Sequence, residues 1–442
     1  NHTVNVYDDK GENVLASSNH FSPISYSMNL KMYDGSGCKI SGLEAVEQNG
    51  YAALFTQLVS AVTIKNLVLE NTSFESNSQY TAGLIAYANA AVNIDNVHFT
   101  KKLHIIGRQA AAGFVAHAAN SITINNSSIE NGNINSTSTR AGGLVANAGQ
   151  AVTLTNVKCT ENLSGIGYSE TGGFVGRAEN SITVTNSDIE NGNISSTNGD
   201  AAGIVSYAGQ SATIDKVNCT GALVINGQNK AAGFVAQAAN SITITNSGIE
   251  NENVGSTDGD AAGLISYAGQ SATIKKVNCT GRLIIIGKKQ AAGFVAEVRN
   301  SITITDSGIE EGTVNSSESN AGGLIGYAAG DSDLSNITLG NKDSNKEDLN
   351  SEFHVQSNGK NWQNASAGGL IARASGGPTI KNVHFNLMLT VENTNNDISN
   401  AEQDAVGGLI GCATAKTDIE ESSITNGLIK SIGTRAGGFV GC

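Results

Sequence analysis

The sequence is poor in proline, in aromatic residues and in cysteine. Of its 442 residues 2 are proline and 6 are cysteine, and aromatic residues make up 5%. So few prolines leave the backbone free to hydrogen-bond almost everywhere. So few aromatic residues do not suit a thick globular core, whereas abundant Gly, Ala, Asn, Ser and Thr suit thin stacked layers.

The chain also lacks a basic stripe and a long apolar run. Its net charge of −13 comes from scattered carboxylates, so we expect neither nucleic acid nor an anionic membrane as a partner. No apolar run approaches the ~20 residues of a membrane span, so we expect no direct span in this segment. The chain starts at Asn1 without an initiator Met or a signal peptide and stops at Cys442 within a repeat. We therefore expect the natural protein to be longer.

The chain does contain a repeat of constant period. An Ala-Gly-Phe/Leu/Ile-Val/Ile motif returns every 30 residues, and it returns three more times after two insertions. A constant period of this length is typical of a solenoid, in which each unit buries its apolar face only against its neighbours. The motif glycines are Gly83, Gly113, Gly143, Gly173, Gly203, Gly233, Gly263, Gly293, Gly323, Gly369, Gly408 and Gly438.

One repeat, residues 231–260, divides into three strand-like pieces separated by Asn, Ser, Gly and Asp clusters. Three strands per turn predict an all-β chain, a right-handed parallel β-helix (β-solenoid) of about 13 rungs. Within the repeat, residues 242–245 alternate Ile inside with Thr outside. Asparagine recurs at one corner of the rung, where it tolerates left-handed geometry and predicts a ladder of side-chain amides. This corner column holds Asn66, Asn96, Asn126, Asn156, Asn186, Asn246 and Asn336, and Lys216, Lys276 and Asp306 break the predicted ladder in places.

The motif Gly-Phe-Val-Ala does not alternate, because both residues after the glycine are always apolar. Either a bulge turns both residues inward, or Val and Ile form an outer stripe for lateral packing; we favour the bulge. A longer period of 60 also exists, since residues 171–230 and 231–290 are largely the same sequence. Such close copies indicate a role that depends on total length, which a unique active site does not need.

Two breaks in the register divide the chain. The predicted segments are a cap and first-rung segment (1–45), regular 30-residue rungs (46–339), an insertion loop (340–366) and a continuing solenoid (367–442) with a second insertion near 386–405. Insertions leave a solenoid as loops, often on the binding face. Phe353 and Trp362, the only tryptophan, therefore mark a candidate binding loop.

Residues 32–74 resemble the entry to solenoids built from the GLUG motif. In that family an Asp-Gly-x-Gly turn precedes Ile-x-Gly-Leu, a Leu-Phe rung and Ile-x-Asn-Leu, and later rungs such as GGLIGYA (322–328) are similar to its core motif. The resemblance implies a large secreted or surface protein, such as an adhesin or part of a surface protease. Many rungs here carry Ala or Ser in place of the family's second glycine. The matching residues are Asp34, Gly35, Gly37, Ile40, Gly42, Leu43, Leu54, Phe55, Ile64, Asn66 and Leu67.

The cysteines fall into two groups. Cys159, Cys219 and Cys279 recur every 60 residues in an inner column, and two rungs of about 4.8 Å place them about 10 Å apart, beyond disulfide reach. We interpret them as small core residues. Cys412 and Cys442 hold equivalent positions on consecutive rungs, so a secreted protein could join them by a disulfide.

Asn-x-Ser/Thr sequons number twelve, which is close to the chance expectation for this composition. Glycosylation is a prediction that depends on a eukaryotic source, and it has most support where Asn-Cys-Thr recurs. The candidate sites are Asn71, Asn135, Asn162, Asn193, Asn218, Asn278, Asn315, Asn336 and Asn364.

These features favour an extracellular, cell-surface structural or adhesive solenoid. We expect a stiff part of a fibre, filament or stalk that associates with itself or with other surface proteins or glycans. We expect no enzyme, no catalytic residues and no cofactor, with structural calcium left open, because no nucleophile, base and orienting group can be assembled around His98 or His384. Two alternatives stay open: a carbohydrate-binding or polysaccharide-degrading β-helix, and an ice-binding protein suggested by outward Thr pairs such as Thr183 with Thr185.

Overall fold

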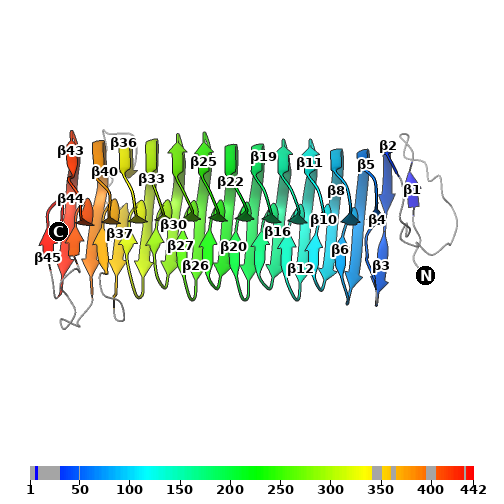
Figure 1. Cartoon of the computed structure of the whole chain (residues 1–442), viewed down its shortest axis with the longest axis horizontal. Helices are drawn as coiled ribbons and strands as arrows, with labels where there is room; N and C mark the ends of the chain where they lie inside the picture. The colour runs from blue at the N-terminus through cyan, green and yellow to red at the C-terminus, as the bar shows by residue number, and fades with distance from the viewer. Residues whose placement is uncertain are drawn as a thin grey trace. The chain divides into compact units, whose positions relative to one another are not determined.

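The chain is an all-β solenoid of parallel strands with about 13 turns and three sheets, which confirms the predicted fold class and the three strands per rung (Figure 1). The computed structural model describes residues 5–7, 30–48, 50–340, 351–359, 365–394, 405–432 and 435–442, and within them every regular element is a strand. The chain forms two compact units. Unit 1 comprises residues 1–213 and 217–220, and unit 2 comprises residues 214–216 and 221–442.

Unit 1 contains strands of all three sheets. The first sheet has β1 (Asn5–Tyr7), β2 (Met32–Ser41), β3 (Glu44–Glu47), β5 (Val62–Ser76), β8 (Val92–Gly107), β11 (Ile122–Asn125), β12 (Ser128–Ser136), β15 (Val152–Thr155), β16 (Lys158–Gly167) and β19 (Ile182–Ser196). The second has β4 (Phe55–Leu58), β7 (Ile85–Ala88), β10 (Val115–Ala118), β14 (Val145–Ala148), β18 (Val175–Ala178) and β21 (Val205–Ala208). The third has β6 (Tyr80–Ala82), β9 (Ala110–Ala112), β13 (Arg140–Gly142), β17 (Glu170–Gly172) and β20 (Asp200–Ala202).

Unit 2 repeats this arrangement, and β22 (Ala212–Gly227) has residues in both units. Its first sheet has β25 (Ile242–Thr245), β26 (Gly248–Ser256), β29 (Ala272–Lys275), β30 (Asn278–Gly287), β33 (Ile302–Ser316), β36 (Ser332–Gly340), β37 (Glu352–Ser357), β40 (Pro378–Asn393), β43 (Asp418–Glu420) and β44 (Ser423–Ser431). Its second has β24 (Val235–Ala238), β28 (Ile265–Ala268), β32 (Val295–Val298), β35 (Ile325–Ala328), β39 (Ile371–Ala374) and β42 (Ile410–Ala413). Its third has β23 (Lys230–Ala232), β27 (Asp260–Ala262), β31 (Ala291–Ala292), β34 (Ala321–Gly322), β38 (Ser366–Gly368), β41 (Ala405–Gly407) and β45 (Arg435–Gly437).

The predicted asparagine ladder is present at the corner of the first-sheet strands. Corner residues such as Asn96 and Asn126 have φ near +50°, a left-handed conformation that asparagine tolerates better than most residues. In unit 1 the amide of Asn96 donates to Asn66 at 2.9 Å, and Asn156 donates to Asn126 at 2.8 Å. In unit 2 Asn382 donates to Asn336 at 2.8 Å. The side chains therefore join neighbouring rungs beside the backbone ladder.

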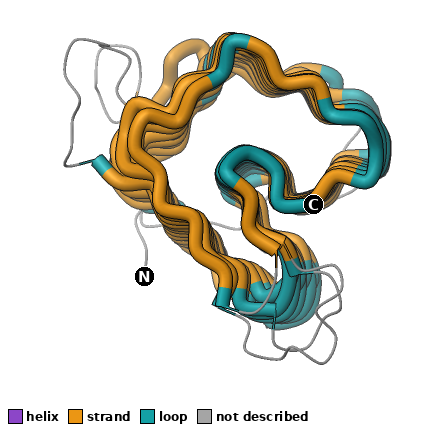
Figure 2. The backbone as a smooth tube through the Cα atoms, turned by 90° about the vertical axis from the view of Figure 1, so that its left-hand side faces the viewer, coloured by secondary structure: helices purple, strands orange, loops and turns teal. Residues whose placement is uncertain are grey.

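The glycine motif forms a hook that turns into the middle of each rung. In unit 1, β9 is followed by a bend at Gly113 and Phe114 and then by β10. Figure 2 shows the hooked path that the backbone takes inside the rungs. Phe114 and Val115 are both 0% exposed, so the outer-stripe alternative is wrong and both residues point inward as the bulge interpretation required. The feature that turns them inward is a bend between two strands.

Alternating packing inside the rungs explains the 60-residue period. Every second rung has one more residue at the far corner of the first sheet, where the register shifts between Ile129 and Asn131. The inward residue after this corner is Leu163 in the longer rung and Gly132 in the shorter one, and the two pair side by side. The inner column compensates, because Cys159 lies in the rung with leucine and Ile129 in the rung with glycine. The two changes thus offset each other in part, because the smaller inner-column residue accompanies the larger corner residue.

The boundaries of the regular solenoid differ from those predicted. Within the predicted cap and first-rung segment (1–45), β2 pairs in parallel with β5 and β1 pairs antiparallel with β2. The segment 340–366 is not a single loop, since β37 pairs with β33 and β40. The second insertion begins later than residue 386, because β40 continues to Asn393. Polar composition concealed these strands, whose alternate residues are nevertheless buried.

Candidate functional site

The outward side chains on either side of the hook form the most varied surface of each rung. They come from the first residue of each third-sheet strand and the third residue of each second-sheet strand, and we call them the mouth residues. In unit 1 they are half-buried or buried and contact one another across the hook. Among them are Tyr80, Tyr87, His117, Arg140, Asn147, Glu170, Arg177 and Tyr207, and we count with them Tyr51, which precedes the bridge of Ala52 with Thr81 and so lies level with Tyr80.

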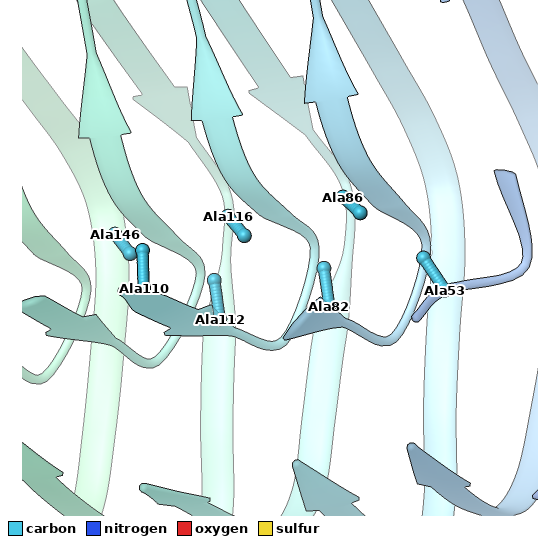
Figure 3. Close-up of a cluster of buried hydrophobic side chains, with 7 residues drawn as sticks. All are labelled: Ala53, Ala82, Ala86, Ala110, Ala112, Ala116 and Ala146. Atoms are coloured by element: carbon cyan, nitrogen blue, oxygen red, sulfur yellow. The ribbon is translucent and has the colours of Figure 1, made fainter. Parts of the chain in front are cut away.

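Alanines form the floor between the two rows of mouth residues in unit 1. Figure 3 shows Ala82, Ala112 and their neighbours from the third sheet facing Ala86, Ala116 and Ala146 from the second sheet. The partly buried rings of Tyr51 and Tyr80 pack against this cluster. Small side chains let the two strands of the hook approach closely, so the longer mouth side chains above them are brought into contact.

Four rings stack at the mouth of unit 1. Tyr80 lies parallel to His117 with ring centroids 5.0 Å apart, and Tyr87 lies 5.1 Å from His117. Tyr51 stacks on both Tyr80 and Tyr87 at 5.7 and 5.8 Å. Asn147 donates from Nδ2 to His117 Nδ1 at 2.8 Å. Burial, and then the charge of Arg140, lower the pKa of His117, which agrees with a neutral ring that accepts this hydrogen bond.

An ion-pair network continues the mouth of unit 1. Glu170 accepts from Arg140 Nε on one oxygen and from Arg177 Nη1 at 2.6 Å on the other. Arg177 also donates to Glu179 at 2.6 Å, which lowers the pKa of that carboxyl, and its guanidinium lies 4.0 Å from the ring centroid of Tyr207. Each charge in this network is paired with another charge of the network. The network therefore stabilises the hook and presents no unpaired charge to a ligand.

The mouth of unit 2 has fewer rings and more isolated charges. Lys230 and Arg299 lie 5.6 and 5.8 Å from the ring centroid of Tyr267, and Arg299 donates to Glu297 at 2.7 Å. Asp260 is 8% exposed and accepts a hydrogen bond from the backbone N–H of Gln290 at 3.0 Å. Burial is the main reason why the pKa of Asp260 rises to about 6.

Sequence reasoning missed the pairing across the mouth. The outward position of Tyr87 and His117 was visible from its variability, and Tyr80 and Arg140 stand at an equal spacing of their own. What was missing was the hook, which alone brings the two rows together. A search for a second variable column just before each Ala-Gly would have found the third-sheet row.

His98 and His384 are held in the same way in the two units. His98 Nδ1 lies 2.8 Å from Ser128 Oγ and its Nε2 lies 2.9 Å from Asn96 Oδ1, and burial lowers the pKa of His98. His384 makes the corresponding contacts at 2.8 Å. This order resembles a nucleophile, base and orienting group, but Ser128 lies in β12, whose backbone is paired with β8 and β16 on its two sides. Its neighbouring N–H groups are therefore not free to hold an oxyanion, and the contacts orient side chains on the sheet.

The three inner-column cysteines occupy the core. Cys159, Cys219 and Cys279 are 1–2% exposed and take part in no disulfide, and burial raises the pKa of Cys159 and Cys279. A thiol that is both buried and protonated reacts slowly, because the thiolate is the nucleophile. This placement agrees with their interpretation as packing residues.

Thiol labelling is expected to report on folding at these three positions. In the native chain a charged thiol reagent should modify Cys38, which is half-buried and free, at least about 100-fold faster than the inner-column cysteines. Mass spectrometry of labelled peptides measures the rates, and the same reaction in denaturant is the control. Rapid native labelling of Cys159 would contradict its place in the core.

The structure forms one disulfide, between Cys412 and Cys442. Their Cα atoms lie 4.6 Å apart on adjacent rungs, as the equal repeat positions suggested.

The candidate binding loop around Phe353 and Trp362 is not supported at Phe353. Phe353 is not in a loop: it lies in β37 with its side chain 0% exposed, because it fills the position beside Gly312 and Leu389 that Leu163 and Gly132 hold in earlier rungs. Trp362 lies outside the described residues.

The candidate glycosylation sites fall into two groups by exposure. Asn71, Asn162, Asn193, Asn218 and Asn336 are exposed, although the amide of Asn336 is engaged in the corner ladder with Asp306. Asn135, Asn278 and Asn315 are half-buried within first-sheet strands. Asn364 lies outside the described residues. Exposure therefore favours Asn71, Asn162 and Asn193 as acceptors, because the amide of Asn218 is also engaged, with Asp188 at 3.3 Å; modification of any of these sites stays a prediction.

Outward threonines pair in register, and charges interrupt the array. Thr153 pairs with Thr183 in unit 1, and Thr185 donates to Thr155 at 3.3 Å. In unit 2 Thr245 donates to Asp215 at 2.6 Å and pairs on its other side with Lys275. Such charges bind water strongly, which disrupts the flat, weakly hydrated face that ice binding needs.

Other searches of the described residues find little that resembles a ligand site. A surface cavity of about 210 Å³ lies at a corner of unit 2, lined by Asn278, Thr280, Glu310 and Thr338 among others. Within the described part of the chain, no group of three or more His, Cys, Asp or Glu side chains is placed to hold a metal ion. None of the described residues forms a helix that could cross a membrane.

No family model matches the sequence, and no curated protein or solved structure shows a significant match to the chain. The resemblance to GLUG-motif solenoids therefore stays a prediction. What the molecule itself defines is a class: a parallel β-solenoid whose mouth and corner side chains are largely paired with each other.

Proposed function

We propose that the chain is an extracellular structural element, a β-solenoid that forms part of a surface fibre, filament, stalk or adhesin. The observation that supports this most is that successive rungs satisfy one another. Inward columns are buried, corner asparagines hydrogen-bond to the next rung, and mouth residues pair across the hook. In such a chain most side chains stabilise the contacts between neighbouring rungs, which is what a structural element made of stacked repeats requires.

The internal copies support the same proposal. The longer and shorter rungs alternate, with the smaller inner-column residue beside the larger corner residue, so a pair of rungs can be added that continues the same packing. A function that grows with length benefits from such additions, whereas a single active site does not. The Cys412–Cys442 disulfide fits the oxidising compartment in which a surface protein matures.

Electron microscopy and sedimentation of the purified chain test the proposal. We expect thin particles of uniform width, whose mass rises with concentration as copies associate into filaments. Thin particles that stay monomeric at every concentration would rule out self-association into filaments and would still agree with a role as a stalk. Compact globular particles would remove the structural role altogether.

Neither alternative function is favoured by a specific contact. Sugar rings stack on free aromatic faces, but the rings of Tyr80, Tyr87 and His117 largely occupy one another's faces. Asp215 and Lys275 interrupt the threonine array that ice binding would use. A glycan-binding and cleavage assay and a thermal-hysteresis measurement are the matching tests, and activity in either would replace the proposal.

A further inference from the structure

One carboxyl group lies in the core of unit 2 without a partner. Glu252 in β26 is 2% exposed, and among the described residues neither of its carboxylate oxygens has a hydrogen-bond partner. Burying an unpaired polar group costs free energy, and burying an unpaired charge costs far more. The group is therefore held as the neutral acid, and burial raises the pKa of Glu252 well above its ordinary value.

The surroundings of Glu252 give it no cation. Its side chain is inserted beside the hook glycines Gly233 and Gly263 and pairs in register with Leu283 of β30. Among the described residues, the buried thiol of Cys279 faces it; burial raises the pKa of Cys279, and an ionised Glu252 would raise that pKa further. Ionisation of either group would therefore disfavour ionisation of the other.

The sister rungs show that this position does not need a carboxyl group. In unit 2 the corresponding residue of β33 is Gly312, which pairs between Leu283 and Phe353. In unit 1 it is Gly132 and Gly192, each paired with Leu163. Glycine fits because the leucine beside it fills the corner. Glu252 is thus an exception in a column that alternates large and very small residues.

A second buried acid lies in the same rung. Asp260, the first residue of β27, is a mouth residue that is 8% exposed. Lys230, Lys289 and Glu297 act on it electrostatically from neighbouring strands and turns, and the backbone N–H of Gln290 donates to it. Two acids of one rung therefore favour their protonated forms in the closed structure.

We propose that the rung of β25, β26 and β27 is a proton-dependent weak point of unit 2, closed while Glu252 is protonated and opening locally as it ionises. In an open rung Glu252 meets water and ionises at its ordinary pKa, so it releases a proton on opening. A raised pKa in the closed state means that the stabilisation is complete below the ordinary pKa and is lost as pH rises toward the raised value. Asp260 adds a second proton up to about pH 6, its raised pKa.

Native-state hydrogen exchange followed by mass spectrometry tests this directly. Exchange rates of the full chain are measured between pH 5 and 8 and divided by the intrinsic chemical rates. The opening constant of peptides covering 248–263 is expected to rise about tenfold per pH unit above pH 6. Peptides of β33, which has Gly312 in place of Glu252, serve as the internal reference and should show a much smaller slope.

Variants separate the carboxyl from the rest of the rung. Glu252→Gln and Glu252→Gly should both flatten the pH dependence above pH 6, and Glu252→Gly should also protect the rung more strongly at pH 8. Glu250→Gln is the matched control, since Glu250 is exposed two residues away, and should keep the wild-type slope. Equal slopes for β26 and β33 in the wild-type chain would overturn the proposal, and that comparison requires no variant to fold.

Discussion

Replacing Gly143 by alanine is expected to prevent stable folding of unit 1, with a loss of more than about 4 kcal/mol in the free energy of unfolding. Gly143 forms the bend of a hook, and a Cβ atom there would overlap the backbone carbonyl of Gly173 on the next rung and lie 3.1 Å from a methyl carbon of Leu163. Backbone atoms of a stacked rung cannot move aside without breaking the ladder. Chemical denaturation followed by circular dichroism measures the loss.

Gly165→Ala is the matched control for this prediction. Gly165 is also buried in unit 1, but a Cβ atom there meets only side-chain atoms, at 3.3 Å from Ile194 and 3.6 Å from Thr171. Those groups can shift by a few tenths of an ångström, so we expect a change within about 1 kcal/mol. If Gly143→Ala and Gly165→Ala unfold at the same denaturant concentration, close packing of the hook does not explain the glycine repeat.

The features that follow from equal spacing could be predicted from the sequence. Parallel in-register stacking places residues 30 positions apart side by side, so the Asn126–Asn156 contact required only the repeat and the hydrogen-bonding chemistry of an amide. The burial of Cys159 and the proximity of Cys412 to Cys442 follow from the same rule. Each of these features depends only on the position of a residue within the 30-residue repeat, and the sequence shows that position directly.

The features that depend on the path within a rung could not be predicted. Tyr80 meets His117 because the hook brings the third sheet beside the second, and no periodicity records that turn. The extra corner residue of the longer rungs is likewise hidden, because a compensating residue elsewhere keeps the overall period at 30. In the sequence Glu252 stands between Asn251 and Asn253 in a polar segment, and nothing there marks it as buried. Its burial follows from the register shift at the corner of β26, which determines the side chains that point inward.

Polar composition was the main source of error at the insertions. The stretch around Phe353 is rich in Asn, Ser and charged residues, which favours a loop. Yet Phe353 and Val355 alternate with exposed or half-buried neighbours, and this short period-2 pattern is what β37 uses to join the first sheet. Alternation over five residues was therefore more informative than composition over twenty.

Reduction of the Cys412–Cys442 disulfide is expected to release the rung that contains β43, β44 and β45. The bond closes a loop of 30 residues, for which loss of chain entropy in the unfolded state corresponds to roughly 3–4 kcal/mol. Apart from the bond, backbone pairing of β44 with β40 and of β45 with β41 joins this rung to the one before it. Hydrogen exchange of peptides covering 414–442, with and without reductant, measures the effect.

The double variant Cys412→Ala, Cys442→Ala should reproduce the effect of reductant, and reductant should then change nothing further. Peptides of β33 and β36 form the internal control, because the free thiol nearest to them, Cys279, has no disulfide to lose. Fast exchange that appears in 414–442 and also in β33 would mean that the bond stabilises the stack as a whole. Unchanged exchange in 414–442 would mean that the backbone ladder alone holds this rung, since the ladder is what remains when the covalent link is gone.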